Sequence, residues 1–409
     1  MSGIGLQEGL GMKMLYIHQH FATLDEGGST RSYYLARALV ESGVAVDLIT
    51  RHNRAVYEIL NIDGIRVHYL PVFYDNAQGF VGRVYSFMKF IGLAYYKARQ
   101  LSRPDWCYAV STPLTTGIIA LLLKYFHHIP YYFEVGDLWP LAPIQMGVIR
   151  NPLLKQLLFA LEKKIYQEAD KIVALSPDIQ DAISQVVVQD KIRLIPNLAD
   201  CAFFQCEPKN PALVKQLGVE DMFVITYFGT IGKANHLEYL LEAARSCQEV
   251  SDRIFFLIAG KGAERVRLQQ IAQTYQLQNV RFLPHVDKYA LRDILNVTDA
   301  AYLSFAAKPV LETGSPNKFF DTLAAGKLCI INFRGWIKAL VEAHSCGVYV
   351  DPNQPNAFYQ RILPFIQQHD QLLKYQRNAR RVAEEQFSRA KLTQQWILLV
   401  TQGRSGPPQ

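Results

Sequence analysis

The sequence predicts an α/β protein with two doubly wound domains, each a mostly parallel sheet between layers of helices. Apolar strand-like segments alternate with helical segments up to about residue 197, and the alternation restarts at residue 223. Such alternation favours parallel strands joined by crossover helices. The chain has 409 residues, half of them hydrophobic, which is enough material for two such domains.

The N-terminal domain is expected at residues 13–199. Its predicted strands lie at 14–20, 44–50, 65–72, 106–111, 129–135, 171–176 and 192–197. Its predicted helices lie at 29–43, within 78–103, after Pro113, at 152–169 and at 177–186. Ligands of doubly wound sheets bind at the carboxyl ends of the strands, so polar residues that directly follow these strands are site candidates.

The C-terminal domain is expected at residues 203–384. Its predicted strands lie at 223–230, 253–262, 280–286, 299–305, 328–333 and 347–351, and its predicted helices at 236–247, 264–275, 288–296 and after Pro316. We expect a last helix at about 385–400 to pack back on the first domain. The tail at 401–409 is expected to be disordered.

The composition indicates a cytoplasmic protein. Its six cysteines, at positions 107, 201, 206, 247, 329 and 346, form no CxxC pair, which is typical of reduced thiols. We expect neither a secretory signal nor a membrane-spanning helix, since no suitable apolar run is present. The net charge of +7 is compatible with anionic small molecules, an anionic lipid surface or nucleic acid.

Several catalytic motifs are missing from the sequence. It contains no GxxxxGK[ST] phosphate loop, no HExxH, no GxSxG and no complete GxGxxG after a strand. It also lacks any Asp-x-Asp, so no carboxylate pair for a metal-bound diphosphate is evident and no metal site is predicted. A diphosphate would therefore be held by helix N-termini and basic side chains.

The stretch "ETGSPNKFFDTLAAGK" at 312–327 offers such a helix N-terminus. Gly314, Ser315 and Pro316 precede a predicted helix, whose free N–H groups and dipole favour an anion. Asn317 and Lys318 would add donors at the same place. Asp321 would lie one turn further along, with its carboxylate available for hydroxyls. The alternative is an ordinary helix start with a capping Ser and a solvated Lys.

Eight motifs occur in an order that resembles the GT-B-fold glycosyltransferases of family 4. They are "HQHFATLDEGGSTRSYYLARAL", "STPLTTG", "YYFEVGDLWP", "ADKIVALSPDIQD", "IRLIPN", "YFGTIGKANHLEYLLEAA", "VRFLPHVDKYALRDIL" and "SPNKFFDTLAAGK". In particular, the chain is similar to the branch of bacterial polysaccharide and O-antigen enzymes that includes the L-fucosamine transferases. The resemblance implies two Rossmann-like domains that face each other across a cleft. It also implies an acceptor in the first domain and a nucleotide-sugar in the second.

The resemblance also implies roles for residues near the predicted strand ends of the first domain. Gly27 and Gly28 would close over the donor diphosphate, and the alternative is a simple turn between strand and helix. Glu134 and Asp137 would face the reacting sugar and the acceptor, as catalytic candidates. Asp137 would orient the acceptor or accept its proton, and the alternative is an Asp that caps a helix. Relatives in this branch carry Arg where this chain has Gly136.

Donor-binding candidates in the second domain follow the same comparison. Asp321 matches the acid that binds the ribose, and Glu312 is a candidate contact for a sugar hydroxyl. Many relatives place Arg and Lys after the Gly that corresponds to Gly229, but this chain has Thr230 and about Asn235 there. The positive charge would then come from a set of lysines: Lys233, Lys261 and Lys318. Among these, Lys318 is also a catalytic candidate, because it would stabilise the charge that develops on the departing diphosphate.

A basic amphipathic helix is predicted at 80–103. The segment carries five basic residues and no acid, with one apolar stripe at helical spacing and further apolar residues beside it: Phe80, Val84, Phe87, Ile91, Ala94, Ala98 and Leu101, widened by Val81, Tyr85, Met88 and Tyr95. This pattern suits a helix that binds an anionic membrane surface. A buried helix with solvated Lys and Arg is the alternative.

The resemblance implies a retaining, metal-independent glycosyltransferase without a cofactor, since the nucleotide-sugar is its substrate. We expect a donor linked to UDP and a glycan or polyprenyl-diphosphate-linked acceptor in the synthesis of bacterial surface polysaccharide. The expected location is the cytoplasm, with a peripheral association at the inner face of the membrane, and no nucleic acid partner. The alternatives are a nucleotide-sugar 2-epimerase on the same fold and a non-catalytic glycosyltransferase-like partner.

Overall fold

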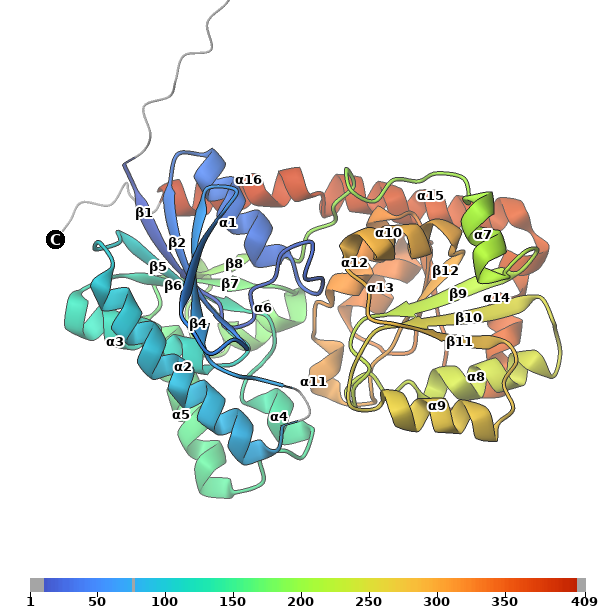
Figure 1. The fold of residues 1–409 in the computed structure, drawn as a ribbon, viewed down its shortest axis with the longest axis horizontal. Coiled ribbons are helices and arrows are strands. Elements are labelled where there is room, and N and C mark those ends of the chain that lie inside the picture. The colour runs from blue at the N-terminus through green and yellow to red at the C-terminus, as the bar shows by residue number, and fades with distance from the viewer. Residues whose placement is uncertain (1–10, 76–77, 403–409) are drawn as a thin grey trace, which may run out of the picture. The chain divides into compact units, whose positions relative to one another are not determined.

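The computed structural model describes residues 11–75 and 78–402, which form two compact units (Figure 1). The first unit contains the chain up to Ala22, the segment Ser29–Pro196 and the chain from Ala390 onward. The second unit contains Thr23–Gly28 and Asn197–Arg389. Most of the expected disordered tail lies outside the described residues.

The first unit is built on an eight-stranded sheet in the order β3-β4-β2-β1-β5-β6-β7-β8. Only the β3–β4 pair is antiparallel. The strands are β1 (Lys13–Ile17), β2 (Ala45–His52), β3 (Glu58–Ile62), β4 (Ile65–Pro71), β5 (Trp106–Val110), β6 (Tyr131–Val135), β7 (Lys171–Ala174) and β8 (Ile192–Leu194).

The helices of the first unit connect these strands in crossover fashion. They are α1 (Arg31–Glu41), α2 (Phe80–Gln100), α3 (Thr115–His127), α4 (Leu141–Gln145), α5 (Pro152–Glu168) and α6 (Pro177–Ser184), followed by a 3-10 turn at Gln189–Lys191. The last helix, α16 (Arg389–Gln402), returns to this unit. Its fully buried Trp396 packs on Tyr108 of β5, with 4.3 Å between the ring centroids.

The second unit has a six-stranded, wholly parallel sheet in the order β11-β10-β9-β12-β13-β14. Its strands are β9 (Phe223–Phe228), β10 (Ile254–Ala259), β11 (Val280–Leu283), β12 (Ala300–Leu303), β13 (Leu328–Ile331) and β14 (Gly347–Tyr349). The central strands β9 and β10 are buried at every residue, as expected for strands covered on both faces.

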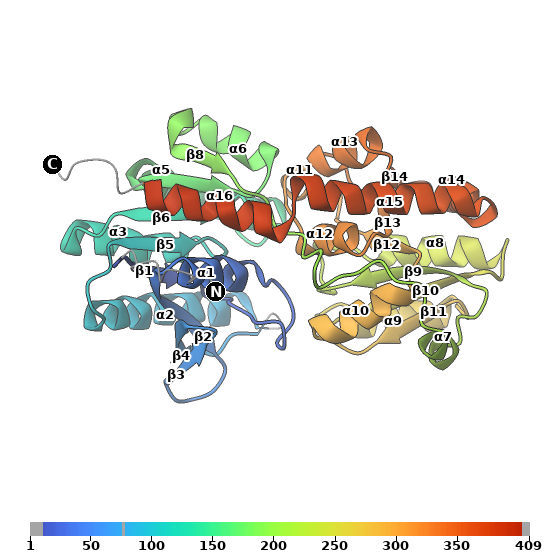
Figure 2. The ribbon, with the colours of Figure 1, turned by 90° about the horizontal axis from the view of Figure 1, so that it is seen from above.

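The helices of the second unit are α7 (Pro211–Leu217), α8 (Glu238–Gln248), α9 (Arg265–Thr274), α10 (Lys288–Val297), α11 (Pro309–Glu312), α12 (Asn317–Ala324), α13 (Trp336–Ala343), α14 (Phe358–Gln367) and α15 (His369–Gln386), with a 3-10 turn at Pro355–Ala357. Residues of α8, α9 and α14 share one hydrophobic cluster with residues of β9, β10 and β12, so these three helices cover the same face of the sheet. Figure 2 shows this unit from above, with α14 and α15 next to each other. The prediction of two doubly wound α/β domains is therefore confirmed.

The strand β3 was not predicted, although its turn carries a clear signal. Asp63 and Gly64 both have positive φ, of 48° and 84°, as a tight hairpin between β3 and β4 requires. The mostly exposed side chains of β3 hide the strand from a search for buried apolar runs.

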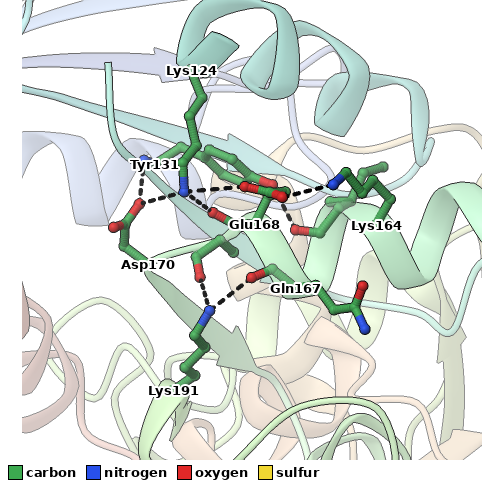
Figure 3. Close-up of polar contacts among 9 residues, drawn as sticks. Lys124, Tyr131, Lys164, Gln167, Glu168, Asp170 and Lys191 are labelled. Carbon is green, nitrogen blue, oxygen red and sulfur yellow. Dashed lines mark hydrogen bonds and ion pairs between the residues drawn. The ribbon is translucent and has the colours of Figure 1, made fainter. Parts of the chain in front are cut away.

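Polar contacts at the amino ends of β6 and β7 fix the end of α5 (Figure 3). Lys191 Nζ donates to the carbonyls of Gln167 and Ala169, at 2.7 and 3.0 Å. Lys124 Nζ donates to the carbonyl of Glu168, and the backbone N–H of the first β6 residue donates to Asp170 at 3.1 Å. Cations at the carboxyl end of a helix stabilise its last carbonyls, so this cluster has a structural role.

Candidate functional site

The N-terminus of α12 presents unpaired donors on a fixed backbone. The carbonyl of Gly314 accepts a hydrogen bond from Trp336 Nε1 at 2.9 Å, and the carbonyl of Ser315 accepts one from Asn197 Nδ2. The side chain of Ser315 is buried, and its hydroxyl has no partner among the described residues. Pro316 directly precedes the first helical residue, Asn317. The first-turn N–H groups and the Ser315 hydroxyl are therefore arranged for an anion.

Lys318 adds a cation at this helix start. Its Nζ lies 2.9 Å from the hydroxyl of Tyr227 and 4.3 Å from the centroid of the Tyr227 ring. Burial lowers the pKa of Lys318 to about 7. A Cβ at Gly229 would lie 3.4 Å from Nζ, so the glycine leaves that face of the ammonium accessible. A bound diphosphate would stabilise the charged form of Lys318.

Asp321 is not the unpaired carboxylate that the sequence suggested. Its Oδ2 accepts a hydrogen bond from Lys288 Nζ at 2.6 Å, and both side chains are buried. Sequence analysis missed Lys288 because it lies 33 residues earlier, at the start of α10. A ribose bound at Asp321 would therefore contact an ion pair that has no net charge. Its hydroxyls would share the Asp321 carboxylate with the Lys288 ammonium.

The loops after β9 and β10 touch each other through their backbones. A Cβ at Gly260 would lie 1.9 Å from the carbonyl oxygen of Gly229, and one at Gly262 would lie 2.1 Å from that of Ile231. Sequence analysis did not single out Gly260 and Gly262, although the "GKG" run was a signal for such close contact.

The other predicted lysines lie on these same loops. Lys233 follows β9 and Lys261 follows β10, and both side chains are exposed. The backbone carbonyl of Lys261 accepts a hydrogen bond from the N–H of Ile231 at 2.9 Å. Both lysines therefore lie near the carboxyl ends of β9 and β10, where they are free to reach a ligand.

Three further predicted positions have contrasting surroundings. Asn235 is buried, donating to the carbonyl of Ser304 at 3.3 Å and accepting the Ser304 hydroxyl at its own carbonyl. It therefore links two loops of the second unit. Thr230 is exposed, and its carbonyl accepts the Tyr227 hydroxyl. Glu312 is half-buried at the end of α11.

The segment Thr23–Gly28 packs against the start of α10. Gly27 and Gly28 have φ values of 70° and 86°, and a Cβ at Gly27 would lie 3.1 Å from the carbonyl oxygen of Val286. The N–H of Lys288 donates to the carbonyl of Leu24 at 3.3 Å. The glycine pair is therefore placed beside the residue that pairs with Asp321.

Asp137 lies after the carboxyl end of β6 in the first unit. Its side chain is exposed, and its carboxylate accepts one long hydrogen bond, of 3.4 Å, from the Thr112 hydroxyl. The N–H of the preceding Gly136 donates to Ser111 Oγ at 3.1 Å. A Cβ at Gly136 would meet Leu175 and Thr112 at ordinary contact distances of 3.7 and 3.8 Å, so the backbone has room for a side chain here.

Glu134 has a different environment from the one expected at a catalytic edge. It lies inside β6 and is 2% exposed. Its Oε2 accepts from Arg31 Nε at 2.9 Å and from the Tyr108 hydroxyl, and Arg31 Nη1 also donates to the carbonyl of Pro196. The Glu134 carboxylate thus forms a buried ion pair with Arg31, which the sequence analysis missed. Asp137 is the acid of this motif that remains accessible.

Two family models match the chain side by side. Residues 26–198 match the glycosyl transferase 4-like domain, and residues 210–382 match the glycosyl transferases group 1. Among curated proteins, the putative colanic acid biosynthesis glycosyl transferase WcaI of Escherichia coli is 27% identical over 249 residues, or 59% of this chain. The uncharacterized glycosyltransferase MJ1069 of Methanocaldococcus jannaschii is 19% identical over 237 residues, or 57% of this chain. The alignments span about 60% of the length of these relatives.

Solved structures with the same two-domain architecture cover nearly the whole chain. Sucrose-phosphate synthase from Thermosynechococcus elongatus has a TM-score of 0.76 at 18% identity, over 96% of this chain and 98% of that one. Anabaena HepE, solved in complex with UDP-glucose, has a TM-score of 0.69 at 17% identity, over 96% of this chain and all of that one. These neighbours confirm the predicted GT-B fold.

Proposed function

This chain belongs to the group 1 glycosyltransferases, and on that premise we propose that it is a retaining, metal-independent enzyme that uses a UDP-sugar. The acceptor is a glycan or polyprenyl-diphosphate-linked sugar in the synthesis of a bacterial surface polysaccharide. The relative WcaI, described as a colanic acid biosynthesis enzyme, supports this pathway class. The complex of HepE with UDP-glucose supports UDP as the nucleotide.

The observation that carries the proposal is the unpaired anion site at the start of α12. The buried Ser315 hydroxyl lacks a partner among the described residues, and the Lys318 ammonium is paired only with a phenol in that part of the chain. Leaving the buried Ser315 hydroxyl unsatisfied costs on the order of 1–3 kcal/mol, which a bound diphosphate would recover. Asp321 lies one turn further into the helix, where the ribose of the same nucleotide would be placed.

The proposed mechanism rests on charge development at the leaving group. Cleavage of the bond between sugar and nucleotide places negative charge on the β-phosphate of UDP. The first-turn N–H groups and Lys318 stabilise that charge, and they do so most strongly in the transition state. The leaving phosphate then helps to take the proton of the acceptor hydroxyl, which attacks from the same face. Asp137 orients the acceptor.

An anionic membrane surface is the proposed location of the acceptor. The first half of α2 exposes Val81, Tyr85 and Met88, which are 79%, 66% and 59% exposed, beside the exposed Lys89. The opposite side of α2 belongs to the core, because Phe90 is fully buried. Three residues of the predicted apolar stripe are buried as well: Ile91, Ala94 and Ala98. An apolar face with basic residues is typical of helices that lie on anionic bilayers.

The membrane association proposed here is peripheral. Across residues 11–75 and 78–402, no helix has the length and apolar character that a membrane crossing needs. The apolar stripe at 80–101 is buried only in part, since Val84 is 40% exposed. The exposed face of α2 is thus broader than the sequence analysis assumed.

The proposal is tested by turnover with purified protein and a panel of nucleotide-sugars. We expect UDP release to require both a UDP-sugar and a lipid-linked acceptor, and to persist in EDTA. Loss of transfer on chelation, restored by Mg²⁺ or Mn²⁺, would contradict the metal-free mechanism. A UDP-sugar that is epimerised without an acceptor would identify a 2-epimerase instead. UDP binding without any turnover would indicate a non-catalytic partner.

A further inference from the structure

A cluster of polar side chains lies at the carboxyl ends of β1 and β2, and the proposed donor chemistry does not use it. His18, Gln19 and His20 directly follow β1. Arg51 lies near the end of β2, and Tyr74 follows β4. Because β1 pairs in parallel with β2, and β2 with β4, these strand ends meet at one edge of the sheet.

Two members of the cluster are buried with hydrogen-bonding atoms that lack a partner. Gln19 is fully buried, and neither its amide nitrogen nor its amide oxygen has a partner in the described part of the chain. His18 is 8% exposed, and its Nδ1 also has no partner in the described part of the chain. Buried polar groups in native proteins nearly always have a partner, so these atoms point to a ligand or to ordered water.

Arg51 places a cation in the same cluster. Its guanidinium lies 4.9 Å from the centroid of the Tyr74 ring, and its Nη1 donates to Asn53 Oδ1 at 2.7 Å. Its Nη2 lies 3.4 Å from His20 Nδ1. The Nε of Arg51 is buried without a partner in the described residues. A partly buried guanidinium with a free donor is suited to an oxyanion.

We propose that this cluster is the acceptor-phosphate subsite, in which Arg51, His20 and Gln19 bind the phosphate or diphosphate that joins an acceptor sugar to its lipid. This inference rests on the proposed function and specifies the acceptor. The guanidinium supplies the charge, while the imidazole and the amide supply further donors to the phosphate oxygens.

The position of the cluster fits a lipid-linked sugar. Strands β1 and β5 separate β2 from β6 in the sheet, so at about 4.8 Å per strand Arg51 lies about 14 Å along the edge from the end of β6, which Asp137 follows. On its other side the Tyr74 ring stacks on Phe87 of α2, with 5.8 Å between the centroids. A phosphate held at Arg51 would thus direct the sugar toward Asp137 and the lipid toward the exposed Tyr85 and Met88.

The test is isothermal titration of full-length protein that has first been saturated with UDP. The probes are farnesyl diphosphate, inorganic pyrophosphate and farnesol. We expect the wild type to bind both diphosphates and to bind farnesol weakly. Arg51→Gln should lower the affinity for both diphosphates by about 10- to 100-fold, which is the loss typical of a charged hydrogen bond. Arg54→Gln is the matched control, because Arg54 is exposed and pairs with Glu58 on the surface.

A second variant guards against misfolding of the first. His20→Phe keeps a ring at the 4.8 Å contact with Tyr74 and removes the N–H donor. It should therefore lower the affinity for both diphosphates severalfold. Unchanged diphosphate affinity in both variants would overturn the inference. Equal losses of diphosphate affinity in Arg51→Gln and Arg54→Gln would also overturn it. The same holds if farnesol binds as tightly as farnesyl diphosphate. If the wild type fails to bind UDP, the proposed function itself fails, whereas intact UDP binding confines the failure to this subsite.

Discussion

Removal of the Lys318 ammonium should change both the strength and the pH dependence of UDP binding. In the free protein, burial holds the pKa of Lys318 near 7. A bound diphosphate favours the charged form and raises this pKa. The affinity gained from the charge is therefore complete below about pH 7, and it is lost as the pH rises toward the higher pKa of the complex.

The size of this effect follows from the shift in pKa. If UDP raises the pKa of Lys318 by about two units, its affinity falls about 20-fold between pH 6 and pH 8.5. Lys318→Met should remove this dependence and weaken binding at pH 6 by about 10- to 100-fold, or about 1.5–3 kcal/mol. UDP itself has a phosphate pKa near 6, so the comparison is the ratio of wild type to variant at each pH.

Isothermal titration across this pH range gives both quantities, with Lys215→Met as control because that lysine is exposed on α7. A ratio of wild-type to Lys318→Met affinity that stays constant from pH 6 to pH 8.5 would refute the reasoning. It would mean that Lys318 does not change its charge near the nucleotide.

Two further predictions concern the Asp321 pair and the membrane helix. Lys288→Met should destabilise the second unit by about 3–5 kcal/mol in urea unfolding, because it leaves the buried Asp321 carboxylate unpaired. The double variant Lys288→Met with Asp321→Asn should recover most of that loss, and no recovery would show that the pair is not the cause. Tyr85→Ser with Lys89→Glu should weaken salt-sensitive binding to anionic vesicles. Equal binding by this variant and the wild type would exclude α2 as the membrane contact.

The architecture was predictable because local patterns specify it. Strands such as Ile254–Ala259 and Leu328–Ile331 are continuous apolar runs, and a parallel sheet covered on both faces requires them. Strand β3 was not predicted, because its mostly exposed side chains form no buried stripe. The Asp63-Gly64 turn was the signal that marks its hairpin.

The site was only partly predictable because tertiary contacts decide its charges. The helix start at Asn317 and the position of Lys318 followed from local sequence. The partner of Asp321 did not, because α10 approaches α12 only in the folded unit. For Glu134 a signal was available, since an acid inside an apolar strand needs a buried cation, and Arg31 supplies it. The role of Gly136, where relatives carry Arg, stays a prediction.

The central claim is that UDP binds at the start of α12, and a crystal structure with UDP tests it most directly. The account predicts the β-phosphate at the N–H groups of Asn317 and Lys318, within hydrogen-bonding distance of Lys318 Nζ and Ser315 Oγ. The ribose should lie at the carboxylate of Asp321. A nucleotide bound elsewhere in the second unit, or a diphosphate that leaves the Ser315 hydroxyl and Lys318 unpaired, would contradict it.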